Sequence, residues 1–322
     1  MFTKTRAFFN PERFQGWGKK RKYFEGWYFK VVNHSEDRAF AFIPGIAMDE
    51  AGKKQAFIQV LDGKKKTSVF HTFDAAVFQP QKGKFELSIG NNFFSETTVG
   101  LQLDDLKGQL NFTGNIPWPK PWYSPGIMGP YAFAPFMECY HGIVSMDHRV
   151  DGMISYQGEQ IDFTNGRGYI EKDWGRSFPS AYFWMQTNHF STPGISLKCS
   201  VAKIPWIRKA FTGFIAGLWL QDKLISFTTY NQSRLLKSFA DESIVEIVLQ
   251  NKKYRLELLA HRDRATILAS PILGLMDGRI EESMSASVDM KLLETKSKKI
   301  IFEDTGRNAG LEVAGKIAEI MV

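Results

Sequence analysis

The sequence predicts an all-β fold, and three observations indicate it. Short runs of alternating or of β-branched and aromatic residues recur along the chain, with turn residues between them. No window of helical length carries a sustained apolar stripe at i, i+3 and i+4, apart from a weak one at 309–321. The run lengths are short and evenly spaced, which is typical of barrels or sandwiches. Few helices are expected.

Candidate strands follow one another from the N-terminus, each ended by polar or glycine-containing turns. In the first half they are WYFKVVN (27–33), RAFAFIPGIAM (38–48), QAFIQVLDG (55–63), KFELSIGNN (84–92) and GQLNFTGN (108–115). In the second half they are GMISYQGEQIDFTN (152–165), GISLKCSVAKI (194–204), the hairpin-like FIAGLWLQDKLISFTTYN (214–231) and SIVEIVLQNKKYRLELLAH (243–261). A further strand is expected over 169–174, followed by one that begins near Tyr182.

The segment 116–136 interrupts this pattern. It contains six prolines, which cannot sit in central strands, so irregular chain is expected. The segment is expected to be a lid that covers a pocket rather than a plain linker, because it contains the aromatic residues Trp118, Trp122, Tyr123 and Tyr131. A chain of 322 residues is long enough for two domains. We expect an N-terminal domain over 1–165, which includes the lid, and a C-terminal domain over 166–322.

Composition excludes several classes of protein. An apolar fraction of 43% and a charged fraction of 23% are those of a folded globular chain. The net charge of +7 comes from short clusters beside turns, at 19–22, 64–66 and 296–299, without a nucleic-acid module, so no nucleic-acid partner is expected. Two cysteines give neither a disulfide framework nor a metal spacing. There is no N-terminal run of signal-peptide length, and the longest apolar run, 210–220, is too short to cross a bilayer.

Nucleotide-binding, zinc-protease and serine-hydrolase motifs are missing from the sequence. The cluster Glu138, Cys139 and His141 resembles a set of metal ligands. However, strand alternation places Glu138 on the face opposite Cys139 and His141, so the three would not converge. A structural role is the better interpretation, and no metal is expected.

The stretch YIEKDWGRSFPSAYFWMQTNHF (169–190) combines carboxyl groups with many aromatic rings. In a strand, Tyr169, Glu171 and Asp173 share one face. A carboxyl held against rings is desolvated, which raises its pKa and makes it a general acid. A purely structural role also remains open, in which Glu171 forms a salt bridge with Arg167, Lys172 or Arg176.

The strand that follows adds a second set of residues to this pocket. Trp184, Gln186 and Asn188 share one face, and a ring followed by two amides suits a pocket that orients an apolar ligand with a polar end.

The sequence resembles the tocopherol cyclase family. The carrying segments are YFEGWYFK (23–30), PGIMGPYAFAPFMECYHGIVSMDH (125–148), FTNGRGYIEKDWGRSFPSAYFWMQTNHF (163–190) and AGLEVAG (309–315). Their order and spacing over nearly the whole chain make the match specific. The resemblance implies two lipocalin-like antiparallel β-barrels. It also implies cofactor-free closure of a chromanol ring on a prenylated quinol, a hydrophobic small molecule.

This chemistry fits the residue types. An acid protonates an alkene, and the neighbouring phenol oxygen captures the tertiary cation in a dry site. Glu171 or Asp173 would be the acid. Trp174 and Trp184 would face the cation, and Gln186 or Asn188 would anchor the quinol beside Tyr169. Glu25 and Glu138 are alternative acids. Glu25 and Trp27, both in YFEGWYFK, complete the expected substrate-binding set.

One departure from the family concerns the site itself. In plant members of the family, the two residues after the glutamate that corresponds to Glu171 resemble an Ala–Asn pair. This chain has Lys172–Asp173 there.

The sequence leaves two other classes open: a lipocalin-like carrier without a catalytic acid, and a carbohydrate-binding sandwich with exposed tryptophans. A cytoplasmic location is expected, because plant members carry a transit peptide and this chain begins without one. Peripheral membrane contact is expected through 204–211, where Trp206 stands beside Arg208 and Lys209.

Overall fold

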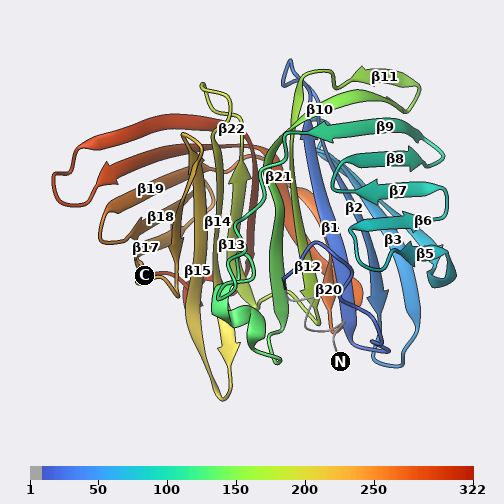
Figure 1. Ribbon diagram of the computed structural model, residues 1–322, viewed down its shortest axis with the longest axis horizontal. Coiled ribbons are helices and arrows are strands. Elements are labelled where there is room, and N and C mark those ends of the chain that lie inside the picture. Colours follow the sequence, from blue (N-terminus) through green and yellow to red (C-terminus); the bar gives the residue numbers. More distant parts are fainter. Residues whose placement is uncertain (1–8) are drawn as a thin grey trace. The chain divides into compact units, whose positions relative to one another are not determined.

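Antiparallel strands make up most of the chain in the computed structural model, which describes residues 9–322 (Figure 1). The chain divides into two units. The first runs to Phe178 and also includes Ala269–Arg279, and the second consists of Pro179–Leu268 and Ile280–Val322. The predicted all-β fold of two lipocalin-like units with few helices is confirmed.

The first sheet has the order β4-β3-β2-β1-β12-β10-β9-β8-β7-β6-β5, with β11 paired to β10. Its strands are β1 (Tyr23–Val32), β2 (Ala39–Met48), β3 (Lys54–Asp62), β4 (Thr67–Asp74), β5 (Phe78–Pro80), β6 (Glu86–Ile89), β7 (Asn92–Ser95), β8 (Thr98–Gln102), β9 (Leu106–Thr113), β10 (Cys139–Tyr156), β11 (Glu159–Asp162) and β12 (Gly166–Gly175). Two 3-10 helices, η1 (Ala75–Val77) and η2 (Gly129–Phe133), lie in its connections.

The second sheet has the order β16-β15-β14-β13-β22-β21-β19-β18-β17, with β20 paired to β21. Its strands are β13 (Ala181–Thr187), β14 (Ser196–Trp206), β15 (Lys209–Leu220), β16 (Lys223–Thr228), β17 (Arg234–Ala240), β18 (Ile244–Gln250), β19 (Tyr254–His261), β20 (Thr266–Ile272), β21 (Leu275–Glu294) and β22 (Ile300–Gly315). The short helix η3 (Ile317–Glu319) follows the last strand. In each sheet the first strand pairs with the last, as β1 with β12 and β13 with β22.

Each unit buries one face of its strands in a core of its own. In the first unit this face of β1 contributes Trp27, Phe29 and Val31, and Trp27 stacks on Phe85 with ring centroids 5.5 Å apart. In the second unit, alternate residues of β13 such as Phe183 fill the same role. Side chains of the opposite face of each sheet therefore point away from the core, because successive strand residues alternate.

The division between the units lies after Phe178, whereas the sequence predicted it after residue 165. Residues 166–175 form β12, which is hydrogen-bonded between β1 and β10. The strand that carries Glu171 and Asp173 therefore belongs to the first unit.

The proline-rich segment 116–136 contains no strand, as predicted, and holds only η2. It is tied to β10 by Ile116, whose amide donates to the Asp147 carbonyl at 3.0 Å. Trp118 is buried, but Trp122 and Tyr123 are 82% and 61% exposed. Its role as a lid over a cavity stays a prediction.

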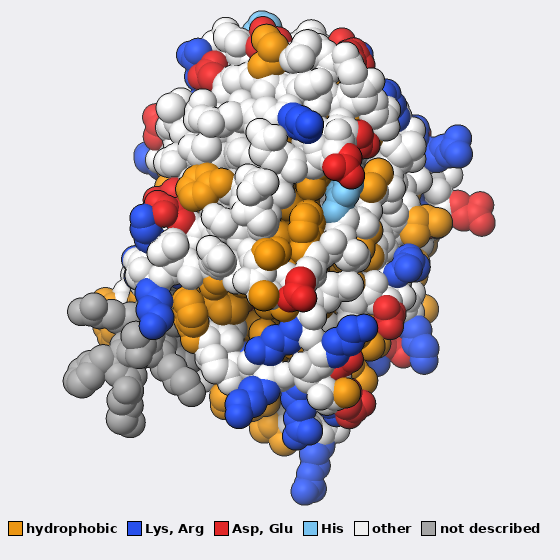
Figure 2. Space-filling view, turned by 90° about the vertical axis from the view of Figure 1, so that its right-hand side faces the viewer, with side chains coloured by type: hydrophobic (Ala, Val, Ile, Leu, Met, Phe, Trp, Pro, Cys, Tyr) orange, Lys and Arg blue, Asp and Glu red, His pale blue; other side chains and the backbone are white. Residues whose placement is uncertain are grey.

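Figure 2 views the first unit from the side where β5 to β8 lie in Figure 1. Hydrophobic side chains are visible in a furrow across the middle of this face, and basic side chains gather below it. Among the described residues, no helix is both long and apolar enough to span a membrane.

Candidate active site

Strand β12 presents two chemically different faces. Ile170 belongs to the core of the first unit and Trp174 packs against it, so Lys172 between them points inward as well. Tyr169, Glu171 and Asp173 occupy the other face. The prediction that these three share a face is confirmed by their contacts.

Glu171 is a buried carboxyl group between two polar side chains. The Tyr169 hydroxyl donates to its Oε2 at 2.5 Å. On the other side, Nε2 of His141 lies 3.6 Å from the same oxygen. The side chain of Glu171 is only 6% exposed, compared with 23% for Asp173. Glu171 is therefore the better shielded of the two predicted acids.

His141 comes to this site from the neighbouring strand β10. It is directly opposite Asp173 in the register of β10 and β12, while Glu171 is opposite Ile143. Its Nδ1 lies 2.8 Å from Oδ1 of Asp173. With Asp173 ionised, Nδ1 carries the hydrogen and Nε2 presents its lone pair toward Glu171. The sequence pattern assigned His141 a structural role, and only the strand register reveals its position.

Burial and charge hold the other polar groups of this face in their protonated forms. The pKa of the Tyr169 hydroxyl is raised well above its usual value by burial and by the charge of Glu171. Burial and the nearby Asp173 also raise the pKa of the Cys139 thiol, whose Sγ lies 3.7 Å from Oδ1 of Asp173. Cys139 is therefore a weak nucleophile, since only thiolates attack readily.

His141, Glu171 and Asp173 form the set of described residues that could hold a metal ion, with one ligand atom from each within 4.8 Å of the others. Three protein ligands is the number found in catalytic zinc sites. In the structure Asp173 contacts Nδ1 of the imidazole and Nε2 faces Glu171, which is also an arrangement for proton transfer.

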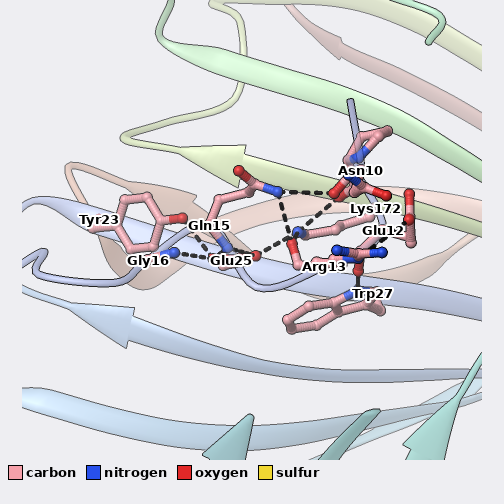
Figure 3. A network of polar contacts seen from close by, with 10 residues as sticks. Asn10, Glu12, Arg13, Gln15, Gly16, Tyr23, Glu25, Trp27 and Lys172 are labelled. Carbon is pink, nitrogen blue, oxygen red and sulfur yellow. Dashed lines mark hydrogen bonds and ion pairs between the residues drawn. The ribbon is translucent and has the colours of Figure 1, made fainter. Parts of the chain in front are cut away.

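On the inward face, Glu25 is the centre of a saturated polar network (Figure 3). Its Oε1 accepts the amide of Gln15 at 2.8 Å and pairs with Nζ of Lys172 at 2.5 Å. Its Oε2 accepts the Tyr23 hydroxyl at 2.6 Å and the amide of Gly16 at 2.9 Å. Both oxygens of Glu25 are therefore occupied by donors of the protein itself, so Glu25 is poorly placed to be the predicted alternative acid.

Lys172 closes the same network around the N-terminal segment. Its ammonium group also donates to the carbonyls of Pro11, at 2.9 Å, and Arg13. The rings of Trp27 and Trp174 lie 4.7 and 4.8 Å from Nζ. Trp174, predicted to face a substrate cation, therefore faces a lysine ammonium, and Trp27 does the same while donating to the carbonyl of Glu12 at 2.8 Å. These tryptophans lie on the opposite face of the sheet from Glu171.

The remaining predicted residues lie elsewhere. Glu138 precedes β10, and its carbonyl accepts the amides of Arg176 and Ser177. Trp184, Gln186 and Asn188 are buried in the second unit. Trp184 and Gln186 lie on the side of β13 opposite its core residues, and Asn188 follows the strand.

The sequence pattern also missed Glu312 in the second unit, which is paired in register with Trp184 and accepts the Tyr182 hydroxyl at 2.7 Å. Glu312 lies in the AGLEVAG segment, one of those that carry the family resemblance, and this segment could have indicated it as a site residue.

The fold and this site define an all-β protein of two lipocalin-like units, with a carboxyl group buried beside a tyrosine and a histidine. Residues 115–315 match the model of a family described as tocopherol cyclase-like. The chain belongs to this family.

Two curated relatives are chloroplast proteins of plants. The chain is 23% identical to a probable tocopherol cyclase of Oryza sativa subsp. japonica over 363 residues, which cover 92% of this chain and 76% of the relative. It is 24% identical to a tocopherol cyclase of Zea mays, with the same coverage.

Solved structures share the fold at low sequence identity. The crystal structure of CghA with Sch210972 has a TM-score of 0.60 at 11% identity and covers 91% of this chain and 88% of that one. A putative AttH from Nitrosomonas europaea has a TM-score of 0.55 at 13% identity, covering 91% and 93%. Both likenesses concern the fold alone.

Proposed function

We propose that this protein is a cofactor-independent cyclase that closes a chromanol-type ring on a prenylated quinol, with Glu171 as the proton donor. The observation that carries the proposal is the buried Glu171 carboxyl, held between the Tyr169 hydroxyl and Nε2 of His141. Membership of the tocopherol cyclase-like family supports this reaction, because the relatives named above are a tocopherol cyclase and a probable tocopherol cyclase.

The reaction needs a strong acid without water. In the proposed reaction Glu171 is the neutral acid at the start of the cycle, and its burial keeps water away from the proton that it donates. Glu171 gives its proton to one alkene carbon, which forms a C–H bond and leaves a tertiary cation on the other carbon. The phenol oxygen bonds to that cation and releases its own proton. Substrate and product therefore have the same mass, and the acid has lost one proton that must be returned.

His141 supplies the return route for this proton. Its Nε2 makes no hydrogen bond to a described residue and lies 3.6 Å from Oε2 of Glu171, a separation that small movements on substrate binding can shorten. The imidazole accepts the phenol proton at Nε2 and passes it to Glu171. Asp173 keeps the ring in the required tautomer by accepting from Nδ1.

The test is incubation with prenylated quinols and chromatographic detection of a product of unchanged mass. Glu171→Gln keeps the size of the side chain but removes the transferable proton, so turnover should fall by about 10²-fold or more while substrate binding survives. Glu138→Gln is the matched control and should remain active. If Glu171→Gln retained full activity, this carboxyl would not be the acid.

If no cyclised product forms, the alternative function is a carrier of hydrophobic ligands. Binding of the quinol by the parent protein without any cyclisation would establish that role. A carbohydrate platform has less support, because Trp27 and Trp184 are buried and the exposed Trp122 lies in the irregular segment 116–136, outside the strands.

A further inference from the structure

The hairpin between β14 and β15 ends in an unusual turn. Trp206 pairs with Lys209 across the hairpin, so Ile207 and Arg208 alone form the turn. Ile207 has φ 56°, a left-handed backbone conformation that is rare for a β-branched residue. Glycine, asparagine and aspartate are the residues that normally take positive φ in such two-residue turns. The sequence therefore places an isoleucine where the backbone favours a small or polar residue.

The side chain of Ile207 makes little packing contact within the protein that could offset this strain. It is 81% exposed. Beside it, Trp206 is half-buried with its ring at an edge-to-face angle to Phe211, with centroids 6.2 Å apart. Arg208 is also exposed. The tip thus carries an aliphatic side chain at its end, aromatic rings behind it and basic charge at its side.

The charged side chains of the hairpin itself are all basic. Arg208 and Lys209 are exposed, and residues 203–221 include no Asp or Glu. Lys203 is already paired with Glu319, so Arg208 and Lys209 supply the charge available to a partner. An anionic surface is complementary to this arrangement.

We propose that the hairpin tip Trp206–Lys209 docks onto an anionic lipid membrane, with Ile207 inserted below the headgroups. Strained backbone is retained where function requires it, and insertion gives the exposed isoleucine an apolar environment. The half-buried indole suits the interface between water and lipid, and the basic side chains suit anionic headgroups. This inference is independent of the proposed reaction, because it rests on the tip alone.

The experiment is co-sedimentation of the full chain with vesicles of phosphatidylcholine, alone or mixed with phosphatidylglycerol. Ile207→Asn relieves the backbone strain, so its unfolding temperature should equal or exceed that of the parent. Its binding to mixed vesicles should nevertheless fall by about tenfold or more, the loss expected from one buried aliphatic side chain. Replacement of Arg208 and Lys209 by glutamine should weaken binding to mixed vesicles by about fivefold per charge, with little effect on neutral vesicles.

Leu273→Asn is the matched control. Leu273 also has positive φ, 50°, in a two-residue hairpin turn and is 47% exposed, so this variant changes the same chemistry at another tip. Its vesicle binding should equal that of the parent. The inference is overturned if the parent binds neither vesicle, if Ile207→Asn binds as well as the parent, or if Leu273→Asn loses as much binding as Ile207→Asn.

Discussion

Asp173 and Glu171 share a face of β12 but have different contacts. Glu171 is nearly enclosed beside Tyr169, whereas Asp173 is partly exposed and holds Nδ1 of His141 at 2.8 Å. Two carboxyl groups in different environments can take different roles in one reaction. At the scale of single residues, the proposed reaction therefore makes Asp173 a positioning residue, whose effect passes through the imidazole.

This role makes a specific prediction for Asp173→Asn. The amide can donate to Nδ1, which would favour the tautomer with its hydrogen on Nε2 and block the return of the proton. We expect the kcat for cyclisation to fall by about tenfold or more with little change in KM. Steady-state kinetics would measure this, and circular dichroism would confirm that the variant folds.

Cys139→Ser is the control for Asp173→Asn, because its sulfur lies 3.7 Å from the same Asp173 oxygen but takes no part in the relay. It should retain kcat. A large rise in KM with unchanged kcat in Asp173→Asn would instead indicate that Asp173 contacts the substrate.

At the scale of elements, a bulge in β10 buries a second histidine, His148, in its neutral form. The register shifts around Ser145, whose hydroxyl donates to the Asp147 carbonyl at 2.8 Å and lies 3.0 Å from Nδ1 of His148. The ring of His148 also packs against Gly168, where a Cβ would come within 2.2 Å of its Nε2. Burial, with a further effect of Arg167, lowers the pKa of His148 to about 3.

Acid should therefore destabilise the fold through His148. Between its unfolded pKa of 6.5 and its folded pKa of about 3, the unfolded chain binds a proton that the folded chain does not. Stability from this group is present above pH 6.5 and is lost as pH falls. From about pH 7 to about pH 5 the loss is about 2 kcal/mol.

Urea unfolding of the parent and of His148→Leu at both pH values would measure this loss. The stability of His148→Leu should fall less with acid than that of the parent, by the His148 contribution. The exposed His34, replaced by Gln, is the control and should behave like the parent. Equal slopes for the parent and His148→Leu would contradict the prediction.

The Glu25–Lys172 network joins three elements: the N-terminal segment, β1 and β12. Both charges are fully buried, so removal of one partner leaves the other without compensation. Lys172→Met should lower the free energy of unfolding by about 3–5 kcal/mol. The double variant with Glu25→Gln should lose less than the sum of the two single variants.

Denaturant titration of the parent and the variants would measure these differences. Lys203→Met, which breaks the partly exposed pair with Glu319, is the control and should cost about 1 kcal/mol or less. A similar small cost for Lys172→Met would show that the network contributes little to stability.

Strand periodicity was sufficient to predict both the fold and the shared face of Tyr169, Glu171 and Asp173. It could not predict the partners of Glu171, because these depend on the register between strands far apart in sequence. Lys172 was considered a partner of Glu171, but adjacent residues of a strand point to opposite faces, and Lys172 pairs with Glu25. Arg167, the second suggested partner, pairs with Asp147.

At the scale of the whole molecule, the chain does not pass through its two units in sequence. After most of the second unit, Ala269–Arg279 returns to the first unit as the hairpin between β20 and β21. The amide of Gly274 donates to the Arg176 carbonyl at 2.7 Å, and the amide of Leu273 donates to Oγ of Ser177 at 2.9 Å. The amide of Ala269 donates to Oε1 of Gln59 at 2.9 Å. The first unit is completed by chain that lies about ninety residues beyond its main segment.

This topology predicts how fragments of the chain behave. A fragment that ends at Phe178 lacks the hairpin and its hydrogen bonds, each of which contributes about 1 kcal/mol. The same fragment with 269–279 attached through a flexible Gly/Ser linker should unfold at a higher urea concentration. Gly274→Ala in the attached hairpin is the control, because Gly274 has φ 89° and a Cβ there would come within 2.1 Å of the Met48 carbonyl oxygen. This change should cancel the gain. Equal midpoints for the fragments with and without the hairpin would mean that the first unit is complete without the returning chain.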